Sequence, residues 1–158
     1  MHRIICAYLL ILVVSFTQDK AFYGKVIRII DGDTIVVLTK MNEQITVRLA
    51  GIDCPEKNQD FGTRAKQGTS ILCFNKQVKI VPSGKDKYGR TIGFVFIDEI
   101  CINEELLKLG LAWHYKKFNQ DENLAQLEWT ARTNKVGLWS LYNPIPPWDF
   151  RANRSGKS

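Results

Sequence analysis

Histidine is scarce in this sequence, and two familiar nucleotide-binding motifs are missing. The chain has two histidines, and only His114 lies beyond the first few residues. A zinc site with several histidines is therefore excluded, and phosphoryl transfer between paired histidines lacks a second partner. No P-loop and no glycine fingerprint for dinucleotides occurs, which argues against both of those binding classes.

Cysteine is also infrequent, and its spacing forms no recognised pattern. Cys6 lies in the apolar N-terminal segment, which leaves Cys54, Cys73 and Cys101 with no C-x-x-C pair among them. This number and spacing exclude a disulfide framework and a cysteine zinc site. Two alternatives stay open: a single bridge between Cys54 and Cys73 in an oxidising compartment, or three buried thiols.

No apolar run is long enough for a membrane-spanning helix. The uncharged stretch from Ile4 to Val14 is shorter than the roughly 20 residues that a span needs, and it has the length of a signal-peptide core. We expect residues 1–17 to be removed after Thr17, which gives a secreted or periplasmic protein with no stable membrane association. An uncleaved membrane anchor is the alternative.

Positive charge exceeds negative charge. Lysine and arginine total 22 against 16 aspartate and glutamate residues, a net charge of +6. Such a bias favours polyanionic partners, including nucleic acid and anionic lipid, but does not by itself choose between them.

Periodicity predicts strands and helices in an α+β order. Alternating or β-branched segments predict five strands, and apolar residues at three- and four-residue steps predict about three helices. The expected strands cover residues 22–30, 34–39, 45–49, 78–81 and 92–97, and the expected helices cover 61–72, 104–109 and 121–133. Three strands, a helix and two strands is the order of a five-stranded OB-fold β-barrel. We therefore expect one domain over residues 18–150, followed by a basic polar tail over 151–158.

Three charged motifs occur in the same order as in a known family. They are Asp31-Gly32-Asp33-Thr34, Arg48-Leu49-Ala50-Gly51-Ile52-Asp53-Cys54-Pro55-Glu56 and Asp86-Lys87-Tyr88-Gly89-Arg90. Together with Asn103-Glu104, Gly110-Leu111-Ala112 and Gly137-Leu138-Trp139-Ser140, they make the chain resemble the staphylococcal nuclease family over nearly its whole length.

The resemblance implies a calcium site and a catalytic set. Calcium is expected on Asp33, Asp53 and the backbone carbonyl of Cys54, where family members often carry threonine. Two carboxylates and a carbonyl leave coordination positions for water and a substrate oxygen, because Ca²⁺ takes about six to eight oxygen ligands. The resemblance assigns Glu56 to the attacking water, and Arg48 and Arg90 to the scissile phosphate, where forked guanidinium donors suit the developing charge.

Contacts to the rest of the substrate are also implied. Lys87 and Tyr88 are expected to meet a neighbouring terminal phosphate, while Tyr115 and Trp113 offer rings on which a base can stack. Core packing is the alternative for Trp113. The expected activity is that of a monomeric, calcium-dependent endonuclease that acts on DNA and RNA and leaves 3′-phosphate ends. A noncatalytic OB-fold module that binds single strands or protein, and a secreted structural domain, are the competing interpretations.

Overall fold

The computed structural model describes residues 20–155, except for the side chain of Ser155. The predicted signal peptide, residues 1–17, lies outside the described residues. Over residues 20–155, no helix combines the length and the apolar character that crossing a membrane requires.

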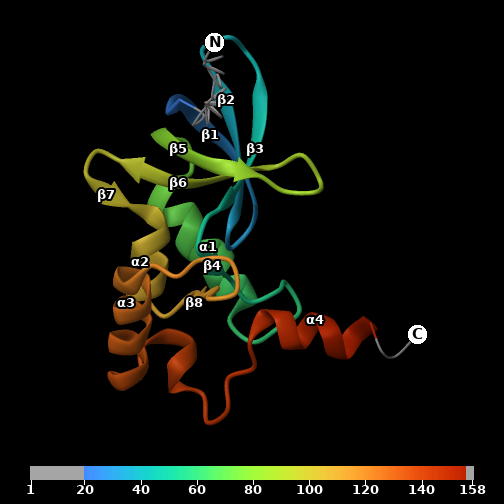
Figure 1. The fold of residues 1–158 in the computed structure, drawn as a ribbon, viewed down its shortest axis with the longest axis vertical. Helices are drawn as coiled ribbons and strands as arrows, with labels where there is room; N and C mark the ends of the chain where they lie inside the picture. Colours follow the sequence, from blue (N-terminus) through green and yellow to red (C-terminus); the bar gives the residue numbers. More distant parts are fainter. Residues whose placement is uncertain (1–19, 156–158) are drawn as a thin grey trace, which may run out of the picture.

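A β-barrel forms the upper half of the molecule in Figure 1. Its strands are β1 (Phe22–Asp31), β2 (Thr34–Thr39), β3 (Gln44–Leu49), β5 (Gln77–Lys85) and β6 (Thr91–Ile97). Antiparallel pairing gives the order β3-β2-β1-β5-β6, and a parallel pairing of β3 with β6 closes the ring. These five strands, taken from the described part of the chain, make the barrel of an OB-fold, so the fold predicted from the sequence is confirmed.

Helices and short strands surround the lower end of the barrel (Figure 1). The helices are α1 (Gly62–Cys73), α2 (Ile102–Lys108), α3 (Glu122–Thr133) and α4 (Pro147–Ser155), with a 3-10 turn η1 (Gly137–Ser140). The short strands are β4 (Ile52–Asp53), β7 (Ile100–Cys101) and β8 (Trp113–His114), of which β4 pairs with β8.

One main apolar core fills the barrel and the space beneath it. Alternation along the strands turns Val26, Ile35, Val47 and Ile80 inward, where they are fully buried. The alternation also determines what faces outward: in β3 Val47 and Leu49 are buried, and Arg48 between them points to the opposite side. The core therefore fixes the direction of a charged side chain at the end of the barrel.

The C-terminal segment differs from the expected tail. The domain is predicted to end at residue 150, but α4 continues from Pro147 to Ser155. Its sequence suits a helix, because Pro147 is at the first helical position, Asp149 lies in the first turn and Arg154 in the last. The predicted boundary therefore falls inside a helix.

The cysteines within residues 20–155 are three buried thiols, and Cys54 and Cys73 form no bridge. Cys54, Cys73 and Cys101 are all free and buried. Burial raises the pKa of the Cys54 thiol well above its ordinary value and that of Cys73 to about 12, which keeps both protonated at neutral pH.

Candidate active site

Two turns at one end of the barrel bring acidic residues together. Asp33 stands in the turn between β1 and β2, and Asp53 ends β4, just after the turn that follows β3. The backbone joins these turns, because the Leu49 N–H donates to the Asp33 carbonyl at 2.8 Å and Thr34 pairs with Arg48 across β2 and β3. Asp33, Arg48 and Asp53 therefore meet at the same end of the barrel.

Gly32 allows the two turns to approach closely. A side chain at Gly32 would lie 2.7 Å from the Cβ of Cys54 and 2.8 Å from the Cβ of Ala65 in α1. The Cys54 N–H donates to Asp33 Oδ2 at 2.7 Å, across the contact that the glycine makes possible. The Asp-Gly-Asp sequence thus serves packing against the second acidic turn as well as the hairpin.

Arg48 bridges the two carboxylates. Its Nη1 is ion-paired with Asp33 Oδ2, and its Nη2 donates to Asp53 Oδ1 at 2.8 Å. Asp33 is 5% exposed and Asp53 is 1% exposed, so both charges are largely removed from water. Burial alone would lower the pKa of Arg48, but Asp33 and Asp53 outweigh it and raise that pKa. The guanidinium therefore stays charged.

The acidic groups repel one another as well. Burial raises the pKa of Asp53, an effect to which Asp33 adds and which Arg151 and Arg48 oppose. Burial, followed by repulsion from Asp33, raises the pKa of Asp31 to about 6. Asp31 Oδ1 accepts the backbone N–H of Asp33 at 3.2 Å, so Asp31 supports the turn rather than joining the Arg48 bridge.

The donor set suits a hard cation. Asp33 and Asp53 offer carboxylate oxygens, while the neighbouring Cys54 thiol is held in its protonated form by burial, and a neutral thiol is a poor metal ligand. Within residues 20–155, His, Cys, Asp and Glu do not form any group of three or more that could hold a metal ion. The chemistry therefore fits a sparse oxygen site for Ca²⁺, completed by backbone and non-protein oxygens.

Glu56 lies on the loop that follows the second acidic turn. Residues 54–61 form no helix or strand, and the Glu56 N–H donates to Gln59 Oε1 at 3.1 Å. Helix α1 begins directly against this loop: a side chain at Gly62 would lie 1.8 Å from the Glu56 carbonyl oxygen. The Glu56 side chain is 38% exposed, so one carboxylate next to the buried pair remains open to solvent.

Arg151 is a member of the cluster that the sequence analysis did not identify. Its Nη2 contacts Asp53 Oδ2 at 2.7 Å, and its Nη1 contacts Asp53 Oδ1 at 3.2 Å and Glu56 Oε1 at 2.7 Å. Figure 1 shows α4, which carries Arg151, lying beside the loop after β4. The helix signal at Pro147 was available in the sequence, but nothing local indicates where that helix docks.

Arg90 stands apart from this bridged cluster. It immediately precedes β6, in which Ile92 pairs with Arg48, so its backbone is near the same end of the barrel. Its Nε donates to Asp86 Oδ2 at 2.6 Å, within the β5–β6 loop. The predicted phosphate-binding pair thus has different partners: Arg48 in β3 pairs with Asp33 and Asp53, while Arg90 in the β5–β6 loop pairs with Asp86.

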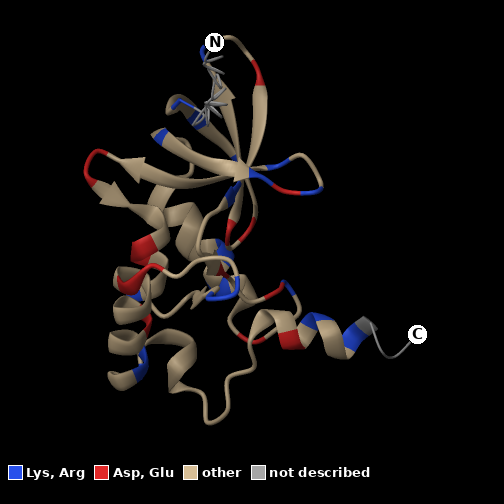
Figure 2. Ribbon diagram, viewed as in Figure 1, with Lys and Arg blue, Asp and Glu red and all other residues tan. Residues whose placement is uncertain are grey.

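Lys87 and Tyr88 are located at the tip of the same loop. Tyr88 is 72% exposed, with Lys87 Nζ 5.0 Å and Arg90 Cζ 5.7 Å from its ring centroid. Figure 2 shows lysines and arginines on this loop and on α4. An exposed aromatic ring among cations suits contact with a phosphate-rich polymer.

Trp113 is a core residue rather than an open stacking platform. It is 6% exposed, and its ring meets Trp139 edge-on at a centroid distance of 4.4 Å and Trp148 at 5.6 Å. Tyr115 stacks parallel to Trp148 at 5.2 Å. One face of the Tyr115 ring is therefore covered by α4.

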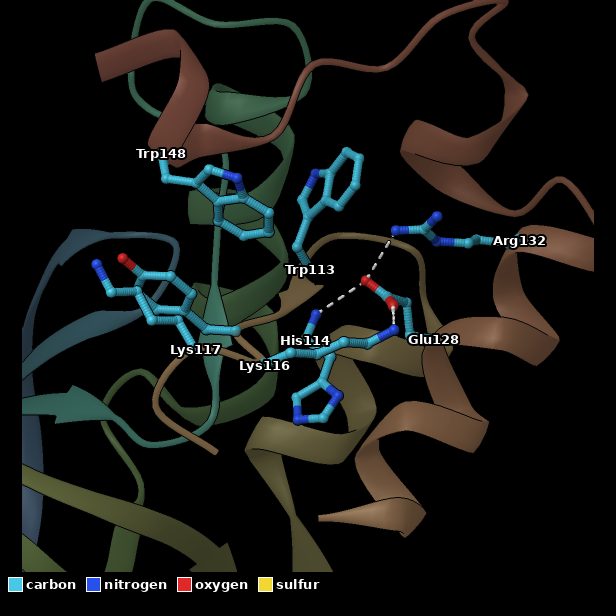
Figure 3. A pocket seen from close by; sticks show the side chains of 8 residues that line it. Trp113, His114, Lys116, Lys117, Glu128, Arg132 and Trp148 are labelled. Atoms are coloured by element: carbon cyan, nitrogen blue, oxygen red, sulfur yellow. Dashed lines mark hydrogen bonds and ion pairs between the residues drawn. The ribbon is translucent and has the colours of Figure 1, made fainter. Parts of the chain in front are cut away.

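A pocket of about 350 Å³ opens beside these rings (Figure 3). It is lined by Trp113, His114, Tyr115, Lys116, Lys117, Glu128, Arg132 and Trp148. The buried Glu128 carboxylate accepts the backbone N–H of His114 at 3.0 Å. It is also ion-paired with Arg132 at 3.2 Å and with Lys116 at 3.5 Å. The basic side chains here thus partly balance an internal acid.

Comparison with known proteins agrees with the charged motifs. A sequence model described as "Staphylococcal nuclease homologue" matches residues 46–141. An "Uncharacterized endonuclease" of Haemophilus influenzae is 43% identical over 127 residues, covering 80% of this chain and 71% of that protein.

In two further relatives, the similarity covers a larger share of the relative's own length. An "Uncharacterized endonuclease" of Escherichia coli is 38% identical over 130 residues, covering 82% of this chain and 84% of the relative. A "Micrococcal nuclease" of Shigella flexneri is 38% identical over 152 residues, covering 89% of this chain and 87% of the relative. With the OB-fold barrel and the matched segment, these similarities show that the chain belongs to the staphylococcal nuclease family.

Proposed function

We propose that this protein is a calcium-dependent endonuclease that hydrolyses phosphodiester bonds of DNA and RNA. The observation that carries the proposal is the pair of buried carboxylates, Asp33 and Asp53, bridged by Arg48 next to the partly exposed Glu56. Family membership supports nuclease chemistry, and the all-oxygen donor set supports calcium.

The metal would be held by Asp33, Asp53 and the Cys54 carbonyl. Bound there, Ca²⁺ would supply Lewis-acid polarisation of a phosphate oxygen. Asp53 Oδ1 accepts an N–H from Arg48 and one from Arg151, and Oδ2 accepts one from Arg151, so a cation at Asp53 would share these oxygens with the two guanidinium groups.

The protein's own groups divide the remaining work. Glu56, which is partly exposed to solvent, orients the attacking water and accepts its proton. Arg48 and Arg90 donate to the phosphate oxygens as negative charge develops on them, and a planar guanidinium can give two such bonds at once. We assign Lys87 and Tyr88 to an adjacent phosphate and Tyr115, whose ring also packs on Trp148 and Phe118, to a base.

Digestion of both polymers by the purified protein tests this proposal. We expect cleavage of DNA and RNA with calcium, no cleavage after chelation, and products that end in 3′ phosphates. Binding without cleavage under any metal condition would favour the noncatalytic OB-fold module. Products with 5′ phosphates would leave the nuclease assignment intact but overturn the assigned direction of bond breakage.

Affinity for nucleic acid should depend strongly on salt. The net charge of +6 and the cations of the β5–β6 loop can neutralise phosphates, whereas no base-reading motif occurs. We expect the affinity of Glu56→Gln for an uncleavable oligonucleotide to fall at least about tenfold from 50 to 200 mM salt, with little sequence preference. A flat response across this titration would argue against a phosphate-based interface.

We also propose that the protein acts outside the cytoplasm. The proposal rests on the apolar segment from Ile4 to Val14, whose length suits a signal peptide. Intact-mass measurement of the exported protein should show a loss of about 17 residues. A membrane-bound product that retains Met1 would contradict it.

A further inference from the structure

The C-terminal segment holds the Glu56 loop at two points. Gln59 Nε2 donates to the Ile145 carbonyl at 2.6 Å, just before α4, and Gln59 Oε1 accepts the Glu56 N–H. From within α4, Arg151 reaches the Glu56 carboxylate itself at 2.7 Å. The loop contains turns closed by its own backbone, from Gln59 N–H to the Glu56 carbonyl and from Gly62 N–H to the Gln59 carbonyl, but no helix or strand, and these contacts join it to the C-terminal segment.

Arg151 also joins Glu56 to the buried carboxylate pair. Its two terminal nitrogens contact both oxygens of Asp53, at 3.2 and 2.7 Å, while one of them also contacts Glu56. A planar guanidinium fixes the relative position of the groups it bonds, because its donors point in set directions. One side chain thereby bonds both carboxylates and restricts their relative position.

The position of Arg151 is itself fixed by aromatic packing. Trp148, three residues earlier in α4, stacks on Tyr115 with an interplanar angle of 2° and meets Trp113 edge-on. Residues three apart lie on the same side of a helix, so the face that packs on the domain also presents Arg151 to the carboxylates. The helix therefore has a defined docking face.

We propose that Arg151 is a positioning residue, through which α4 holds Glu56 beside Asp53 in the geometry needed for water activation. This inference rests on the proposed nuclease function. It assigns a role in the reaction to a helix that lies beyond the family match over residues 46–141. Arg151 acts through Glu56, so its effect should depend on the Glu56 carboxylate being present.

Three variants separate this role from general effects of charge. Arg151→Gln removes the fork, and Arg151→Lys keeps the charge but replaces the fork with a single ammonium group. Arg154→Gln is the matched control. Arg154 is exposed on the same helix and lies over Phe150, and it does not make the ion pairs that Arg151 makes with Asp53 and Glu56. Each variant is made in the wild-type and Glu56→Gln backgrounds.

The first readout is hydrogen exchange of residues 55–61, which requires no catalysis. Arg151→Gln should increase exchange of this segment at least about threefold, whereas Arg154→Gln should leave it unchanged. Unchanged exchange in Arg151→Gln would overturn the proposal that Arg151 holds the Glu56 loop in place. This result is informative even if the wild-type protein cuts no nucleic acid, an outcome that would defeat the proposed function instead.

The second readout is single-turnover cleavage, with enzyme in excess over oligonucleotide and calcium at saturation. Arg151→Gln should lower the maximal rate constant at least about tenfold with little change in the enzyme concentration that gives half of it, because a small displacement of a catalytic group slows the chemical step. Arg151→Lys should recover part of the loss, and Arg154→Gln should stay within about twofold of wild type.

The Glu56→Gln background identifies the route of the effect. There, Arg151→Gln should cost less than about twofold, because groups that act as a unit are not additive. An equal loss in both backgrounds would mean that Arg151 acts independently of Glu56, and would overturn the positioning role. Faster cleavage by Arg151→Gln would overturn it too, since Arg151 would then compete with the cation for Asp53.

Discussion

Glu56→Gln is expected to lower kcat at least about a hundredfold, the lower end of what a general base contributes. Glutamine has the same size and can still meet Arg151, but it cannot accept the proton of the attacking water. Binding of an uncleavable oligonucleotide should remain within a few-fold of wild type, because Glu56 is not assigned to the phosphate.

Single-turnover cleavage at saturating calcium measures this effect without interference from product release. Glu43→Gln is the matched control, since Glu43 is exposed in the turn between β2 and β3, at the other end of β3 from Arg48. A rate for Glu56→Gln equal to that of Glu43→Gln would remove Glu56 from the mechanism.

Arg48→Lys should also reduce kcat by at least about a hundredfold, the typical loss when a preorganised donor to the transition state is removed. Lysine preserves the charge. It cannot, however, reproduce a planar fork that pairs with Asp33 through one nitrogen and Asp53 through the other. The two carboxylates would lose their shared bridge as well as a forked donor to phosphate.

Arg28→Lys is the control for this second variant, because Arg28 is an exposed arginine of β1. Circular dichroism and thermal unfolding verify that each protein is folded before the rates are compared. Near wild-type cleavage by folded Arg48→Lys would show that the bridge is structural only.

Much of the barrel end could be predicted from sequence because its determinants are local. Alternating Val47, Arg48 and Leu49 specify which side chain leaves the core, and short turns after β1 and β3 place Asp33 and Asp53 close to it. The order of strands and one intervening helix then restricts the topology to an OB-fold.

The remainder of the site depends on long-range packing. Arg151 is 98 residues from Asp53 in sequence, and their contact requires α4 to dock through Trp148 onto Tyr115 and Trp113. A run of prolines followed by basic residues resembles a solvated tail until that aromatic surface exists. Likewise, no sequence pattern reveals that Arg90 is held by Asp86, because this depends on the turn geometry of the β5–β6 loop.

Calcium titration of single-turnover DNA cleavage tests the central claim most directly. Purified wild-type protein should show no cleavage in chelator, a saturable rise with added Ca²⁺ and loss of activity when chelator is restored. Asp53→Asn, which removes one of the two buried carboxylate charges, should need far more calcium or fail to cleave at any concentration. Cleavage that continues undiminished in chelator, or a titration of Asp53→Asn that matches wild type, would contradict the proposed metal-dependent site.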